Sequence, residues 1–260
     1  MKTSLELKVI NFSYDGKKKV LKKISLKINP GDFICILGPN ASGKSTLLKC
    51  MSRLNRVIDD SIFINGKDIN GFKNNEIAKK IAFLPHVHQF SFPYKVLDLV
   101  LMGRTPYLKY FEKPSKKDKE IAIDAMKRIG ILSLKDRLHT ELSGGQLQLV
   151  MLARSLTQES EILLLDEPTS HLDLANQVKI LNIIKMLSEQ GISIIMASHF
   201  PGHAFVSSGF VGLIKEGKLI AYGNADEVVT ERNLKKTYGL DIRIVRIDNG
   251  VNRKICIPIW

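Results

Sequence analysis

The chain has 260 residues, of which 44% are hydrophobic and 25% are charged, values that are typical of a soluble globular protein with a full core. Its longest apolar runs, near 96–102, 162–165 and 192–197, are much shorter than the roughly 20 residues of a membrane-spanning helix. Residues 1–8 lack an apolar signal-peptide segment, and three distant cysteines do not suggest a disulfide framework, so we expect a soluble intracellular protein.

The net charge of +13 raises the question of an anionic partner. The lysines are scattered along the whole chain, and the densest clusters, Lys17–Lys19 and Lys116–Lys117, lie beside Gly16 and Pro114 in predicted surface loops. We therefore predict no nucleic-acid partner. The basic surface is compatible with a position near anionic lipid.

The first part of the chain predicts strands around a glycine-rich loop. Alternating or continuous apolar residues indicate three strands and a hairpin, at 5–9, 21–28, 32–37 and 61–69. The third strand is apolar throughout, as expected of a central strand that is covered on both faces. Helical spacing follows over 44–53, which gives the order strand, loop, helix.

From about Pro85 to Gln158 the pattern is mostly helical, and we interpret residues 87–160 as a helical subdomain inserted into an α/β core. Its predicted helices are 96–103, 117–130 and 146–158. The elements expected after it are strand 161–166, helix 174–190, strands 192–198, 211–214 and 219–222, and helix 225–238. A hairpin of 242–247 with 254–259, turning at 248–250, is expected in the C-terminal segment 240–260. We predict a single domain, residues 1–260.

The loop after the third strand has the composition of a phosphate-binding loop. Its residues are Gly38, Pro39, Asn40, Ala41, Ser42, Gly43, Lys44, Ser45 and Thr46. Two glycines allow the backbone to wrap the phosphates, and the first amides of the next helix point at them. Lys44 can bridge the β- and γ-phosphates, Ser45 can ligate Mg²⁺, and Thr46 is a further phosphate donor. A chance glycine-rich turn would not fill all the fixed positions.

An acidic pair follows the apolar strand 161–166. Four aliphatic residues bury this strand and bring Asp166 to its carboxyl end, where open α/β sheets bind ligands. Asp166 would hold Mg²⁺, directly or through water, and Glu167 can polarise the water that attacks the γ-phosphate. A core strand that ends in a solvated acidic turn is the alternative interpretation. The phosphate loop disfavours that alternative.

The pentapeptide LSGGQ, Leu142–Gln146, precedes the acidic strand. The three motifs in this order resemble those of ATP-binding cassette (ABC) ATPases, and the resemblance covers nearly the whole chain. It implies an α/β P-loop NTPase (RecA-like) core with an N-terminal antiparallel β subdomain and the inserted helices. It also implies ATP and Mg²⁺ as cofactors.

In that family the pentapeptide opens a helix whose amides bind the γ-phosphate held by a partner subunit. The resemblance assigns this role to Ser143, Gly144, Gly145 and Gln146, because a small hydroxyl can cap the helix and glycines admit close approach. A capped helix after a Gly-Gly turn would explain the glycines. It would not explain their place before the acidic strand.

Three further residues match family positions by their local sequence. Tyr14, ahead of the phosphate loop, resembles the aromatic residue that stacks on adenine. Asp173 resembles the residue of the loop that couples the two sites of the dimer. His199, after the strand 192–198, resembles the histidine that contacts the γ-phosphate.

One family position departs from the usual pattern. Relatives have a glutamine after a phrase like Phe83-Leu84-Pro85, and it reaches the Mg²⁺ and the attacking water. This chain has His86 there, with Gln89 three residues later. Either Gln89 takes the role through a shifted loop, or a neutral His86 accepts the hydrogen bond. A neutral imidazole would lose that ability in mild acid, which would make turnover sensitive to pH.

The chain lacks the long coiled coils, the second cassette and the membrane helices of other ABC proteins, so it resembles a stand-alone transport cassette. The phrase 92–104 resembles cassettes of importers for iron chelates, haem and cobalamin, at the place where the family docks a membrane subunit. The resemblance implies a head-to-tail homodimer, peripheral at the cytoplasmic face of the membrane on permease subunits. A substrate-binding protein would be met only indirectly. The alternative is a soluble ABC ATPase of the repair or cofactor-assembly type that clamps a cytosolic partner.

Overall fold

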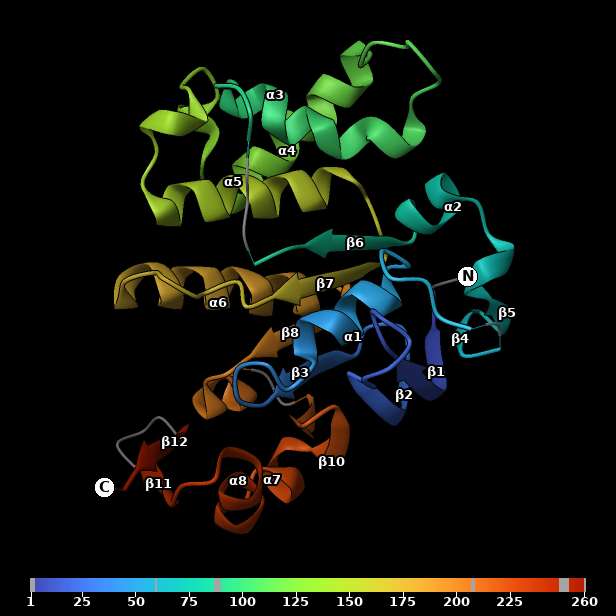
Figure 1. Ribbon diagram of the computed structural model, residues 1–260. Coiled ribbons are helices and arrows are strands. Elements are labelled where there is room, and N and C mark those ends of the chain that lie inside the picture. Colours follow the sequence, from blue (N-terminus) through green and yellow to red (C-terminus); the bar gives the residue numbers. More distant parts are fainter. Residues whose placement is uncertain (1–2, 59, 87–89, 207–208, 248–252, 260) are drawn as a thin grey trace.

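A computed structural model of the protein describes residues 3–58, 60–86, 90–206, 209–247 and 253–259. A central sheet separates an antiparallel sheet and α1 from a block of helices, and a small hairpin lies near the C-terminus (Figure 1). No helix in these ranges has the length and apolar character needed to cross a bilayer.

Six strands form the central sheet, in the order β10, β9, β3, β8, β7, β6. Their bounds are β3 Phe33–Leu37, β6 Ile81–Leu84, β7 Ile162–Asp166, β8 Ser193–Ser198, β9 Phe210–Lys215 and β10 Lys218–Asn224. All neighbours are parallel except β9 and β10. The parallel arrangement brings the carboxyl ends of β3, β7 and β8 to one edge of the sheet.

The central strands are apolar throughout because each face belongs to a different core. In β3, Phe33, Cys35 and Leu37 pack towards the helices, whereas Ile34 and Ile36 pack towards α1 and the antiparallel sheet. Strands β7 and β8 alternate in the same way. Burial on both faces is the reason that these strands read as continuous apolar runs.

The second sheet is antiparallel and holds β2, β1, β4 and β5 in that order. The bounds are β1 Leu5–Phe12, β2 Leu21–Ile28, β4 Ile62–Ile64 and β5 Lys67–Asp68. Helices α1 (Lys44–Met51) and α2 (Asn74–Ala78) follow β3 and β5. The hairpin predicted at 61–69 is confirmed, and Asn65 and Gly66, both with positive φ, form its turn between β4 and β5.

The helical block packs beside β6 and contains α3, α4 and α5 (Figure 1). The bounds are α3 Val96–Leu101, α4 Lys116–Ile129 and α5 Gly144–Thr157. The remaining elements are α6 Leu174–Glu189, α7 Ala225–Val228, α8 Glu231–Tyr238, β11 Ile242–Ile247 and β12 Arg253–Pro258. Short 3₁₀ turns are Ile69–Gly71, Met102–Tyr107, Leu132–Leu134, His139–Glu141 and Pro201–Phe205.

Most predicted elements are confirmed, and three expectations were wrong or incomplete. The helix expected over 225–238 is two helices, because Thr230 is extended and its hydroxyl accepts from the Asn233 amide as the cap of α8. The helix expected over 96–103 ends at Leu101 and tightens into the 3₁₀ turn that contains Pro106. Strand β6 and helix α2 were not predicted, since four or five residues carry too little periodicity. The predicted turn 248–250 lies outside the described residues.

Candidate functional site

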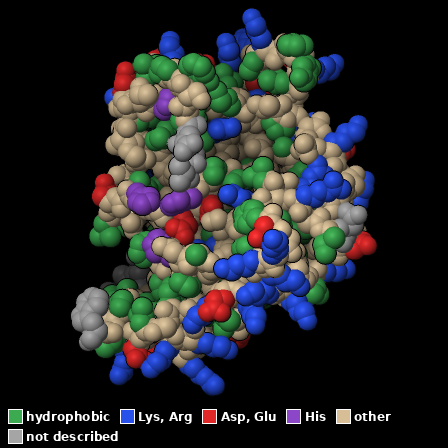
Figure 2. All heavy atoms as spheres, viewed as in Figure 1, with side chains coloured by type: hydrophobic (Ala, Val, Ile, Leu, Met, Phe, Trp, Pro, Cys, Tyr) green, Lys and Arg blue, Asp and Glu red, His purple; other side chains and the backbone are tan. Residues whose placement is uncertain are grey.

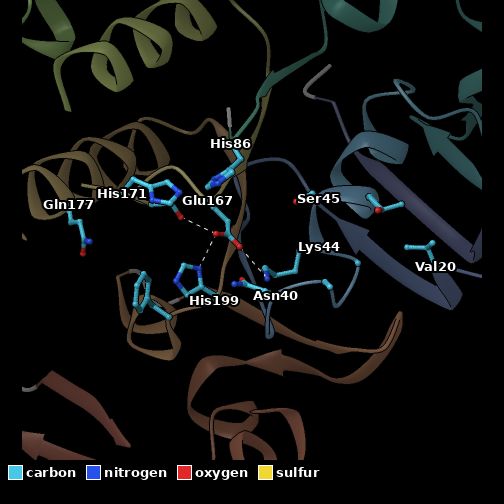
Figure 3. A pocket seen from close by; sticks show the side chains of 14 residues that line it. Val20, Asn40, Lys44, Ser45, His86, Glu167, His171, Gln177 and His199 are labelled. Atoms are coloured by element: carbon cyan, nitrogen blue, oxygen red, sulfur yellow. Dashed lines mark hydrogen bonds and ion pairs between the residues drawn. The ribbon is translucent and has the colours of Figure 1, made fainter. Parts of the chain in front are cut away.

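The edge at the carboxyl ends of β3, β7 and β8 contains a cleft of about 720 Å³ (Figure 3). The phosphate loop forms one side, and the segments after β6, β7 and β8 form the others. The polar side chains in its lining include Lys44, Ser45, His86, Glu167, His171 and His199. Five of these six were predicted to act together, although they come from four separate parts of the chain.

The phosphate loop forms a tight cradle before α1. Gly43 has φ 106°, a conformation that side chains oppose, and a Cβ on Gly38 would lie 2.1 Å from the Ile214 carbonyl oxygen. The Lys44 ammonium is buried and donates to the carbonyl oxygens of Gly38 and Pro39 at 2.9 and 3.0 Å. The predicted loop residues that line the cleft are Asn40, Ala41, Gly43, Lys44, Ser45 and Thr46.

The turn between β9 and β10 braces this loop from outside. The amide of Gly217 donates to the Ser42 carbonyl at 2.9 Å, and the amide of Lys22 donates to the Gly217 carbonyl at 2.7 Å. A Cβ on Gly217 would lie 2.0 Å from the Val20 carbonyl oxygen, and its φ is 76°. Only glycine therefore allows the loop, β2 and the turn to meet so closely.

Ser45 and Asp166 lie together as predicted for a Mg²⁺ site. The Ser45 hydroxyl donates to Oδ1 of Asp166 at 2.8 Å. Neighbouring ligands of an octahedral Mg²⁺, each about 2.1 Å from the ion, lie roughly 3 Å apart, so this pair of oxygens fits. Burial raises the pKa of Asp166 against the opposing hydrogen bond from Ser45. A buried carboxylate of this kind gains from a nearby cation.

Glu167 is held by three side chains. Its carboxylate lies 3.3 Å from the Lys44 ammonium, accepts the Ser170 hydroxyl at 2.9 Å and lies 2.9 Å from Nδ1 of His199 (Figure 3). Burial alone would raise the pKa of Glu167, but the Ser170 hydrogen bond and the Lys44 charge outweigh it and lower the pKa. Glu167 also has φ 50°, a strained value for a residue with a side chain. The structure thus keeps an ionised carboxylate in one fixed position.

The rings of His86 and His171 lie next to each other at the cleft, with centroids 5.4 Å apart and planes tilted by 47° (Figure 3). Nδ1 of His86 is buried and has no hydrogen-bond partner within the described chain. Gln89 lies outside the described residues. His86, one of the two residues predicted for the glutamine role, lines the cleft.

The LSGGQ segment begins α5 and contacts the start of α6. Ser143 and Gln146 form a reciprocal cap, with hydrogen bonds of 3.3 and 3.1 Å between side chain and backbone. A Cβ on Gly145 would lie 2.5 Å from Cγ of Asn176, whereas one on Gly144 would meet its nearest atom at 3.9 Å. Asp173 caps α6 by accepting from both the amide and the side chain of Asn176 at 2.8 Å. None of these residues is among those that line the described cleft.

Comparison with known proteins identifies the family. The profile of the family described as ABC transporter matches residues 21–170, more than half of the chain. The chain belongs to the ABC transporter family. The iron(3+)-hydroxamate import ATP-binding protein FhuC of Bacillus subtilis is 36% identical over 255 residues, which cover 98% of this chain and 94% of FhuC. The ABC family membership confirms the predicted fold class and the enzyme class, an ATPase.

Two solved structures of ABC proteins are similar over most of the cassette. A chain of an ABC transporter described as of metal-chelate type, in an inward-facing conformation, is 29% identical with a TM-score of 0.87. The match covers 100% of this chain and 98% of that one. The cassette MJ0796, in a dimeric post-hydrolysis state with ADP and Pi, is 28% identical with a TM-score of 0.72, over 85% of this chain and 98% of that one.

Sequence reasoning missed two residues that line this cleft. Ser170 and His171 lie on the turn after Glu167, where the Ser170 amide donates to the Glu167 carbonyl at 3.1 Å. The signal that could have found Ser170 is its spacing of three residues from Glu167, which is the reach of such a turn. Tyr14, the predicted adenine contact, is exposed, and its hydroxyl lies 3.2 Å from Oγ1 of Thr46.

Proposed function

We propose that the protein is the ATP-binding subunit of a membrane importer that takes up a metal chelate, such as an iron–siderophore, haem or cobalamin. The proposal is supported by the similarity to FhuC and to a transporter of metal-chelate type, and by the phrase 92–104. In this role the chain is peripheral at the cytoplasmic face and binds permease subunits. It meets a substrate-binding protein only through them.

The proposed role of Glu167 in ATP hydrolysis is supported by its contacts with Lys44, Ser170 and His199. The phosphates of ATP carry more negative charge than one carboxylate, so they compete with Glu167 for the Lys44 ammonium. Glu167 then remains bound to Ser170 and His199, ionised and oriented to accept a proton from water. The strained backbone at Glu167 fits this fixed orientation.

Mg²⁺ would be held by Ser45 and Asp166 and, when bound, would neutralise charge on the phosphates. The loop residues 38–46 bind the phosphates through backbone amides, and Tyr14 packs on the adenine. His86 substitutes for the usual glutamine near the attacking water, with Gln89 as the alternative. His199 contacts the γ-phosphate while it orients Glu167.

The site is completed by a second copy of the chain. Residues Ser143–Gln146 do not line their own cleft, yet they present a capped helix N-terminus, which favours anions. A head-to-tail dimer would bring this N-terminus to the nucleotide of the other copy. Asp173, beside the same helix, would couple the two sites.

The test uses Glu167→Gln, with Glu189→Gln on the exposed end of α6 as a matched control. We expect Glu167→Gln to bind ATP with Mg²⁺, to lose hydrolysis and to elute as a dimer in size-exclusion chromatography, while the control behaves like the wild type. A monomeric Glu167→Gln protein in ATP and Mg²⁺ would refute the shared site. Membrane co-purification with permease subunits, followed by chelate-stimulated ATPase activity, tests the import role.

A further inference from the structure

Two aromatic side chains project from the connection between α3 and α4. Tyr110 and Phe111 are 91% and 95% exposed, more than the other large hydrophobic residues of the described chain. Their rings pack edge to face with centroids 4.9 Å apart. A soluble protein gains nothing from holding two such rings in water, so the pair points to a contact surface.

The backbone of residues 109–112 forms a closed turn that exposes Tyr110 and Phe111. The Glu112 amide donates to the Lys109 carbonyl at 3.0 Å, and the Glu112 carboxylate accepts the Lys109 amide at 2.8 Å. This closed turn puts Tyr110 and Phe111 at its two corner positions. Phe111 has φ 65°, a conformation that favours glycine and is rare for a bulky residue. Glycine in place of Phe111 would form the turn more easily, so we infer that the phenylalanine ring itself contributes to a contact.

Lysines surround this turn. Five exposed lysines lie within eleven residues of sequence: Lys109, Lys113, Lys116, Lys117 and Lys119. None of their ammonium groups is paired with a carboxylate in the described parts of the chain. Figure 2 shows hydrophobic side chains framed by Lys and Arg at the upper end of the molecule, over the connection between α3 and α4 in Figure 1.

Two of these lysines lie at the N-terminus of helix α4. Lys116 and Lys117 occupy its first turn, where the helix dipole disfavours cations. The Asp118 carboxylate in the same turn cannot offset them fully, because it is buried and bonded to Arg104 at 2.8 Å. The helix therefore tolerates an unfavourable charge arrangement beside the exposed aromatic turn.

We propose that the turn 109–112 and the lysines at the start of α4 form a binding site for an anionic lipid surface. The Tyr110 ring with its hydroxyl suits the level of the lipid headgroups, the apolar Phe111 ring can insert just beneath them, and the lysines around both rings are attracted to anionic lipid. The choice of lipid over another partner rests on the proposed function at the membrane and on this charge complementarity. One short turn anchors weakly, so the contact orients a subunit that other contacts hold.

The test is sedimentation of the purified full chain with vesicles, without permease subunits. Vesicles of phosphatidylcholine are compared with vesicles of phosphatidylcholine and phosphatidylglycerol, at low and high salt. We expect binding to the anionic vesicles only, weakened by salt. Phe111→Gly keeps or improves the turn but removes a ring, so reduced vesicle binding cannot be ascribed to misfolding.

A matched pair of triple variants separates this surface from general positive charge. Replacement of Lys113, Lys116 and Lys117 by Gln is expected to lower the vesicle partition constant by about fivefold per lysine. The same replacement at Lys17, Lys18 and Lys19 removes equal charge elsewhere and is expected to have a much smaller effect.

Three results would overturn the proposal. They are absence of binding to anionic vesicles, an equal loss in both triple variants, and unchanged vesicle binding by Phe111→Gly together with lost permease binding. The last would assign the turn to a protein partner. ATPase activity and dimer formation are expected to stay at wild-type levels in all these variants, so failure here is distinct from failure of the proposed function.

Discussion

Gly145→Ala tests how the LSGGQ segment is joined to α6. The new Cβ would lie 2.5, 2.7 and 2.8 Å from the three amide atoms of Asn176. Carbon atoms pack at about 3.5–4.0 Å, so the whole amide must move by about 1 Å or more. That movement breaks the hydrogen bond from the Asn176 side chain to Asp173.

The magnitude follows from three opposing effects. Alanine is favoured over glycine in a helix by about 1 kcal/mol. Overpacking costs about 1–3 kcal/mol, and the lost hydrogen bond costs about 0.5–1.5 kcal/mol. We therefore expect Gly145→Ala to lower the free energy of unfolding by about 1–3 kcal/mol, whereas Gly144→Ala, with its nearest atom at 3.9 Å, leaves it unchanged or slightly raised.

The assay is urea unfolding followed by circular dichroism. The double variant Gly145→Ala with Asn176→Ala should recover much of the loss, because the clashing amide is gone. Equal unfolding midpoints for the two glycine variants, or no recovery in the double variant, would refute the reasoning. ATPase activity does not discriminate here, since both glycines belong to the proposed nucleotide-binding segment.

Three other predictions concern polar groups in the core and in the cleft. The pKa of His203 is lowered to about 4 by burial and then by His199, so the unfolded chain takes up a proton near pH 6.5 and the folded chain only near 4. The contribution of His203 to the free energy of unfolding should thus fall by up to roughly 3 kcal/mol from pH 6.5 to 4 in urea titrations, and the total fall should be smaller by this amount in His203→Gln. Arg104→Met removes the partner of a buried carboxylate and should destabilise by roughly 3–5 kcal/mol in the same assay, against less than about 1 kcal/mol for the exposed Lys185→Met. Chelation of Mg²⁺ should stop ATP hydrolysis, and Ser45→Ala should raise the Mg²⁺ concentration for half-maximal activity by roughly tenfold; an unchanged Mg²⁺ requirement would argue against the assigned ligand.

The parts of the site that sequence reasoning found are those whose chemistry demands fixed residues. Gly38 and Gly43 are required by backbone geometry, and the acidic pair follows an unmistakable buried strand. The contacts of Glu167 could not be predicted in the same way, because they depend on β8 lying beside β7 and on the turn that places Ser170. The strained φ of Glu167 could not be predicted either, because glutamate is not a residue type that favours positive φ.

The fold shows the same division. Long periodic segments such as α4 and α5 were found within a residue or two, while β6 depends on its pairing with β7 and carries no pattern of its own. The break at Thr230 was hidden because the apolar spacing continues through it and only a local cap interrupts the backbone. The aromatic turn at Phe111 escaped notice because a positive φ is expected of glycine.

The brace between Gly217 and the phosphate loop has a consequence for biosynthesis. The phosphate loop 38–43 is synthesised early. The turn at Gly217, which contacts Ser42, Val20 and Lys22, is synthesised some 170 residues later. A nascent chain can therefore complete this brace only after Gly217 has been synthesised. Fragments that stop before β9 lack both the brace and the strand that pairs with β3, so we expect them to bind nucleotide more weakly than the full chain.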